Sequence, residues 1–234
     1  MIGYLTWRGT GWRIRYYEEE IGGVKMLRAE LPGPARPGRG LRLARRAVET
    51  LRCNGVTRFL NPGPGVPRTV ATGPLWRALA APLAVTGLTA LGVPTAEARV
   101  ALRAERVDRS VAACCAALAG EVRALSLEIP DCDGLTWSLQ RRFGIPVLTG
   151  GGDLTLCFSG QGDGVDLRGD APTPEGFALR SPALELPGGC PAEPLLAYFV
   201  EQGLLHLSDI SVVPAEEQKV FVEKDWEVCY NKES

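Results

Sequence analysis

The side chains that could form a ligand site stand at turns between regular segments in the middle of the chain. Arginines there could bind a phosphate or a carboxylate, because guanidinium is a forked donor matched to those groups. In an open α/β sheet, ligands bind outside the carboxyl ends of the strands. We therefore predict that any pocket lies at that edge and takes a small anionic ligand. Its candidate lining residues are Arg103, Arg106, Asp131, Asp133, Thr149, Gly150 and Ser159.

The turn that would hold a dinucleotide lacks the necessary glycines. Such a site places glycines at the first strand-to-helix turn, so that backbone N–H groups can approach the pyrophosphate. Here residues 101–110 read ALRAERVDRS, without a glycine. Glu128 or Asp131 stands where an acidic residue would bind the ribose. We expect no cofactor, and we favour the interpretation that the arginines of this turn are solvated and pair with nearby carboxylates.

Other possible reactive groups have simpler structural interpretations. Asp131 and Asp133 flank Cys132, which could mean paired carboxylates or an activated thiol, but aspartate is also a preferred helix N-cap. Cys114 and Cys115 are adjacent, unlike the spacing of zinc ligands, and are expected in the core. We therefore assign no catalytic role here.

A single histidine limits the possible chemistry further. His206 is the only one in the chain, so a site with several histidine ligands is impossible, and we predict no metal. Asp209 follows three residues later, but no nucleophile motif accompanies the pair as a catalytic triad would require. A half-buried or surface histidine is the favoured interpretation.

A basic segment suggests a third class of function, nucleic-acid binding. A helix is predicted over residues 41–53, and Arg42, Arg45 and Arg46 on its polar face could contact phosphates. The formal net charge is −1, from 26 basic and 27 acidic residues, and arginine is the usual cation throughout. A solvated helix face is therefore favoured over nucleic acid. The full patch is Arg36, Arg39, Arg42, Arg45, Arg46 and Arg52.

The elements that must position these groups alternate between strand and helix. That alternation predicts an α/β fold with a Rossmann-like parallel sheet flanked by helices. The predicted strands are 98–104, 123–130, 145–148 and 154–158, and the predicted helices are 107–122 and 135–143. Glycines 150–152 are expected to connect two strands, and Gly160, Gly162 and Gly164 to form a hairpin or loose turn.

The flanking segments complete the expected organisation. Residues 1–31 read as a small antiparallel β meander and 32–40 as a linker. Helix 41–53 and strand 56–60 open the Rossmann-like domain, expected over 41–160, and the apolar stretch 75–93 reads as two helices meeting near Pro82. An irregular α/β portion is expected over 161–214, with strands at 165–168, 183–186 and 210–213 and a helix after Pro194, and a tail over 215–234.

Composition sets the remaining expectations. Seven scattered cysteines are unlike a disulfide framework, and no secretory leader is evident, so we expect a cytoplasmic protein without a membrane span. Our leading hypothesis is a non-catalytic protein that binds a protein partner or a small ligand. The alternative is an enzyme or nucleotide-binding protein with an atypical pocket at the carboxyl ends of the strands. The sequence leaves partner, substrate and oligomeric state open.

Overall fold

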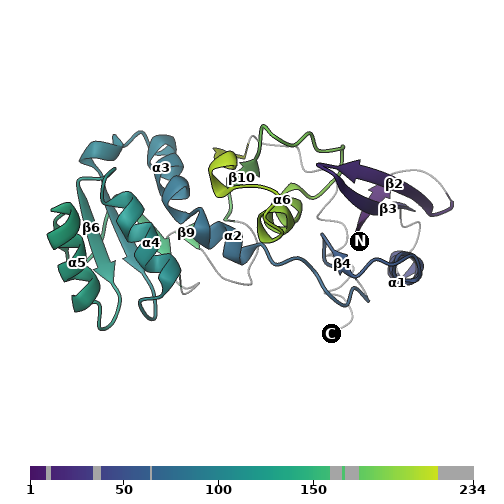
Figure 1. Cartoon of the computed structure of the whole chain (residues 1–234), viewed down its shortest axis with the longest axis horizontal. Coiled ribbons are helices and arrows are strands. Elements are labelled where there is room, and N and C mark those ends of the chain that lie inside the picture. The colour runs from purple at the N-terminus through teal and green to yellow at the C-terminus, as the bar shows by residue number, and fades with distance from the viewer. Residues whose placement is uncertain (9–11, 34–37, 64, 159–164, 167–173, 216–234) are drawn as a thin grey trace. The chain divides into compact units, whose positions relative to one another are not determined.

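The computed structural model describes residues 1–8, 12–33, 38–63, 65–158, 165–166 and 174–215. The chain divides into two compact units, each of which is described by itself. The first contains Met1–Val70 and Pro182–Tyr198, and the second contains Ala71–Ser181 and Phe199–Ala215. Figure 1 shows the elements of both units, coloured along the chain.

The sheet of the first unit has four strands in the order β2-β3-β1-β4. β2 and β3 form the antiparallel pair that the sequence predicts. The predicted meander is wrong for β1, which pairs in parallel with both β3 and β4. The reason is burial, because the first four residues of β1 are all buried, as in a central strand, whereas β2 is mostly exposed, as at an edge. The strands are β1 (Ile2–Arg8), β2 (Arg15–Ile21), β3 (Val24–Pro32) and β4 (Arg58–Phe59).

Helix α1 (Arg39–Cys53) connects β3 to β4 and packs on this sheet. Its apolar residues recur every three or four positions, which places them on one buried face. This face joins a core with strand residues such as Leu5, Leu31 and Phe59. The helix ends before Gly55, whose φ of 87° is easily adopted only by glycine. The buried residues of α1 are Ala44, Ala47, Val48 and Leu51.

The second unit is built on five parallel strands in the order β7-β6-β5-β8-β9. The chain begins this sheet at β5, adds β6 and β7 on one side, and then adds β8 and β9 on the other side of β5. This strand order confirms the predicted Rossmann-like sheet. The reversal puts a topological switch point between β5 and β8. The strands are β5 (Arg99–Arg103), β6 (Ala124–Glu128), β7 (Val147–Leu148), β8 (Leu154–Cys157) and β9 (Val165–Asp166).

Two helices follow the first two strands of this sheet. α4 (Arg109–Leu118) follows β5 and α5 (Asp133–Phe143) follows β6, and the two helices pack against each other (Figure 1). Cys114 and Cys115 are buried in α4, as the sequence predicts. α5 ends at Gly144, which has a left-handed φ of 67°.

The connection from β7 to β8 contains no helix. These strands lie on opposite sides of the β5–β6 pair, about 14 Å apart at roughly 4.8 Å per strand. The chain from Leu148 to Leu154 spans at most about 20 Å when extended, which leaves no room for the usual crossover helix. A Cβ at Gly152 would lie 2.8 Å from Arg99 O and Ala101 N of β5. Only glycine fits where this connection meets β5.

β9 pairs in parallel with β8. The hairpin or loose turn expected at the glycines between these two strands stays a prediction. Gly160, Gly162 and Gly164 themselves lie outside the described residues.

The apolar stretch 75–93 forms two helices, as predicted. α2 (Gly73–Ala78) and α3 (Ala80–Ala90) are separated at Leu79, and Pro82 lies in the first turn of α3, where its missing N–H costs no hydrogen bond. α3 contacts α4, β8 and β11 (Ser211–Pro214). Within the described ranges, no helix combines the length and apolar character that crossing a membrane requires.

The second unit also contains an antiparallel pair, β10 (Phe177–Arg180) and β11, whereas Pro182–Tyr198 belongs to the first unit. The strand predicted at 183–186 is wrong, because Pro182 and Pro187 enclose that segment and proline removes ladder donors. α6 (Ala192–Glu201) contains Pro194 in its first turn, as predicted. Short 3-10 helices lie at Thr95–Glu97 and Leu207–Asp209. The expected tail from residue 216 onward and part of the expected linker, 34–37, lie outside the described residues.

Candidate functional site

The switch point of the second unit is where a Rossmann domain would hold a phosphate group. The N-terminus of α4 lies there, and its N-cap is Asp108. The Asp108 carboxylate accepts a hydrogen bond of 2.9 Å from the Val111 backbone N–H and one of 2.7 Å from the Ser110 hydroxyl. An aspartate N-cap satisfies a helix-end donor that would otherwise need another acceptor. The side chain therefore supplies a negative group at the helix start.

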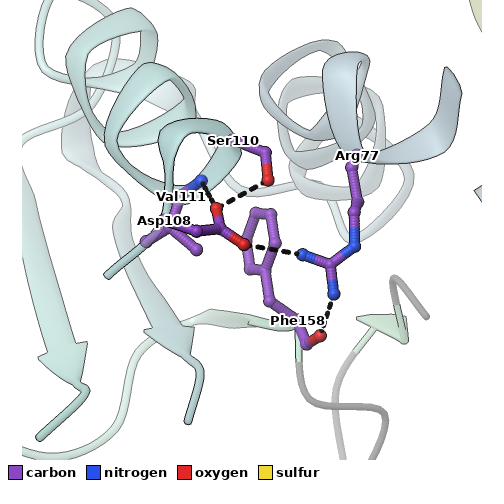
Figure 2. A network of polar contacts seen from close by, with 5 residues as sticks. All are labelled: Arg77, Asp108, Ser110, Val111 and Phe158. Carbon is purple, nitrogen blue, oxygen red and sulfur yellow. Dashed lines mark hydrogen bonds and ion pairs between the residues drawn. The ribbon is translucent and has the colours of Figure 1, made fainter. Parts of the chain in front are cut away.

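Arg77 of α2 completes the network shown in Figure 2. Its guanidinium contacts Asp108 Oδ2 at 3.2 Å and donates to the Phe158 carbonyl at 2.6 Å. The same guanidinium lies 5.5 Å from the centre of the Phe158 ring. Phe158 directly follows β8, and its N–H bonds to the Arg103 carbonyl of β5 at 2.8 Å. Arg77 thus joins the helix start to the carboxyl end of β8.

Electrostatics favour the ionised form of Asp108. Partial burial alone would raise its pKa, but the hydrogen bonds from Val111 and Ser110 and the charge of Arg77 outweigh that effect, and the pKa is lowered. The carboxylate is therefore charged at neutral pH. Its negative charge lies at the N-terminus of α4, where the helix dipole would otherwise stabilise a bound anion.

A second pair lies at the end of β6, where the sequence suggests Glu128 as one candidate for the acidic partner of a ribose. Glu128 ends β6, and its Oε2 accepts from Arg103 Nε at 2.8 Å and lies 2.7 Å from Arg103 Nη2. Its Oε1 accepts from the Gly151 N–H at 3.1 Å. The hydrogen bond from Arg103 is the main reason that the pKa of Glu128 is lowered. The acidic residue expected to bind ribose is thus held by the chain itself.

The other predicted lining residues lie on the segments that follow β5, β6 and β7, and Thr149 and Gly150 contact Arg99 at the amino end of β5 rather than its carboxyl end. Arg106 is exposed between β5 and α4, and Asp131 is exposed between β6 and α5 with a left-handed φ of 51°. Thr149 and Gly150 turn their carbonyls to the Arg99 guanidinium of β5. Ser159 lies outside the described residues. That these residues bind a ligand stays a prediction.

The start of α5 differs from the expectation of an aspartate N-cap. The N-cap residue is Cys132, whose side chain makes no capping hydrogen bond, and Asp133 stands in the first turn. A carboxylate in the first turn still interacts favourably with the helix dipole. Asp133 therefore has a structural role close to the predicted one, one position further along.

The reactive side chains do not form a catalytic or metal centre within the described ranges. No group of three His, Cys, Asp or Glu side chains there is arranged to hold a metal ion. Asp209 accepts from the backbone N–H of His206 rather than from its imidazole, so it does not orient that ring as a triad would. Burial raises the pKa of Cys115 to about 12, which leaves that thiol unreactive.

Two polar clusters in the structure are not predicted from the sequence. The first includes Arg77, whose only signal was a charged residue within an apolar stretch. The second lies in the first unit, where the Tyr4 hydroxyl donates to Glu19 and Glu19 pairs with Arg28 at 3.1 Å. Burial and the hydrogen bond to Glu19 raise the pKa of Tyr4. Tyr4 is fully buried, so its hydroxyl connects the core of the sheet to the partly exposed ion pair of Glu19 and Arg28.

The predicted basic residues of α1 are on the surface. Arg42, Arg45 and Arg46 are all exposed, opposite the buried face of the helix. Arg39, the first residue of α1, lies 5.8 Å from the ring centre of Trp12. Arg36 lies outside the described residues.

Comparisons with known proteins add little to this description. No family model matches the chain, and the comparison with curated proteins finds no match. Among solved structures, the chain is similar to L-tryptophan dehydrogenase from Nostoc punctiforme, with a TM-score of 0.30 and 16% identity. The match covers 58% of this chain and 44% of that chain. So weak a likeness supports no argument about activity, and the Rossmann-like description rests on the strand order.

Proposed function

We propose that this chain is a non-catalytic binding protein in which the Rossmann-like sheet serves as a scaffold. Its ligand is a protein partner or a small anionic molecule. The observation that carries the proposal is the network of Arg77, Asp108 and Phe158 at the switch point. It lies at the helix start, where Rossmann domains in general hold a nucleotide phosphate.

The energetics of this network oppose a nucleotide. A phosphate at the start of α4 would have to displace the Asp108 carboxylate from the Val111 N–H or lie beside a like charge. Arg77 offers little compensation, because its guanidinium is already bonded to Asp108 and to a backbone carbonyl. Binding there would break formed hydrogen bonds and leave polar groups without partners.

The competing function is an enzyme or nucleotide-binding protein with an atypical pocket at the same edge. Its ligand would have to replace Glu128 as the partner of Arg103. Such a pocket would use the exposed Arg106 and Asp131 on the adjoining turns. The two functions differ in whether a nucleotide stabilises the folded protein.

Thermal unfolding with a panel of NAD⁺, NADP⁺, FAD and ATP separates them. We expect no change in Tm and no turnover of any compound. A ligand present at 100 times its Kd would add about 2.7 kcal/mol to stability, which such a scan resolves. Stabilisation of the wild-type protein that is lost in Arg103→Ala but kept in Arg106→Ala would overturn the proposal in favour of the pocket.

A further inference from the structure

A groove at the open end of the β2–β3 hairpin contains chemistry that the scaffold role does not use. It lies wholly within the first unit and has a volume of about 430 Å³. That volume falls in the range of small-ligand sites. Its lining includes Arg8, Trp12, Arg13, Arg15, Glu30 and Pro32.

The charge in this groove is positive. Glu30 is already engaged, since it pairs with Arg8 at 3.7 Å and accepts from the Tyr17 hydroxyl at 3.2 Å. Arg13 and Arg15 are exposed and have no carboxylate partner within the described part of the chain. The groove therefore presents guanidinium groups suited to phosphate.

Trp12 adds an aromatic surface to these cations. Its side chain is 82% exposed, which is unusual for so large an apolar group. An exposed indole beside arginines matches the stacking platforms of proteins that bind single-stranded nucleic acids. A base has the flat face that such a platform accepts, and a phosphate-only ligand would leave Trp12 unused.

A basic face of α1 continues from the groove. Arg39 lies over Trp12, and Arg42 and Arg46 follow it at helical spacings of three and four residues, on one side of the helix. The distance along the helix from Arg39 to Arg46 is about 10 Å at 1.5 Å per residue. Positive charge thus extends beyond the groove, as an extended polyanion would require.

We infer that this groove and the adjoining face of α1 bind single-stranded nucleic acid. A base stacks on Trp12, and the phosphates on either side contact Arg13 and Arg15 and then Arg42 and Arg46. Duplex is disfavoured, because stacking on Trp12 requires an unpaired base face. The inference goes beyond the proposed function, because it assigns a different class of ligand to a groove in the first unit and does not depend on the switch-point network of the second unit.

Fluorescence anisotropy of the full chain with a labelled oligothymidylate and a labelled oligouridylate, each about 12 nucleotides long, tests this inference. We expect binding of at least one strand, and weaker binding of a duplex of the same length. Trp12→Ala should weaken binding about tenfold or more, the loss expected for one stacked base. The double variant Arg13→Ala/Arg15→Ala should reduce the slope of log affinity against log salt by about 0.7 for each arginine.

The chain offers matched controls in the second unit. Trp137 of α5 is 61% exposed with Arg141 at 4.8 Å from its ring centre, so Trp137→Ala and Arg141→Ala/Arg142→Ala remove equivalent groups elsewhere. These variants should bind as the wild type does. No binding of either strand, equal losses in the controls, or an unchanged Trp12→Ala would overturn the inference. In the nucleotide panel, an effect lost in Arg103→Ala reports on the second unit and an effect lost in Trp12→Ala reports on this groove, so failure of one proposal is distinguishable from failure of the other.

Discussion

At the scale of single residues, Asp108 does more than any other to define the switch point. The same carboxylate caps α4, holds the Ser110 hydroxyl and neutralises Arg77. A capping residue is common in any helix. Asp108 differs from an ordinary cap because Arg77 bonds both to its carboxylate and to the Phe158 carbonyl after β8.

Removing this cap has a defined cost. Asp108→Ala should lower the free energy of unfolding by about 1 kcal/mol through loss of the helix cap, whereas Asp108→Asn keeps an acceptor for Val111 and should cost less. Urea unfolding measures both, with the exposed Arg106→Ala as control. A loss in Asp108→Ala no larger than in Arg106→Ala would contradict the role given to the cap.

The two lowered carboxyl pKa values predict acid sensitivity. A carboxyl whose folded pKa lies below its unfolded value of about 4 stabilises the protein above that value. The contribution is lost as the pH falls through the folded pKa. Glu128, whose pKa is lowered by Arg103 and Gly151, should therefore contribute to a fall in stability below about pH 4.

Unfolding free energies across that pH range test this sign. The stability of Glu128→Gln should fall less steeply with acid than that of the wild type, and Glu105→Gln, on the exposed turn before α4, should behave as the wild type does. If the free energy of unfolding fell equally steeply with acid in Glu128→Gln and in the wild type, the ion pair of Arg103 and Glu128 would contribute nothing to stability.

At the scale of elements, the order of strands and helices in the second unit follows from hydrophobic pattern, and the sequence predicts it well. α4 and β6 both lie within the predicted ranges, because buried apolar residues at the right period define them. The pairing of β1 could not be predicted from its own residues. Strand direction depends on which neighbours bury its apolar side chains, and those neighbours are distant in the sequence.

The connection from β7 to β8 gives a sharp prediction about glycine. Gly152→Ala should destabilise the second unit by about 1–3 kcal/mol, because its Cβ would overlap the β5 backbone. Gly134→Ala, in α5 with open space around the added atom, should be neutral or stabilise by about 0.4–1 kcal/mol. Thermal or urea unfolding distinguishes these opposite signs, and equal effects would refute the close approach at Gly152.

At the scale of the whole molecule, the first unit has a mixed sheet and the second a five-stranded parallel sheet, and helices pack on both. The sequence could predict that the usual dinucleotide turn lacks glycine. It could not predict that Arg77 closes the switch point, because Arg77 and Phe158 are 81 positions apart. Nor could it show that Trp12 and the arginines near it line one groove, since that grouping depends on the hairpin and on α1.

On the proposed function, side chains of the protein itself occupy the nucleotide position of its Rossmann-like sheet. Calorimetric titration of the full chain with NAD⁺ and with ATP tests it most directly, with Arg77→Ala/Asp108→Ser as the comparison variant. The wild type should give no binding heat up to millimolar ligand, and any gain should appear only in the variant that opens the helix start. Saturable binding of one nucleotide by the wild type, lost in that variant, would contradict the claim.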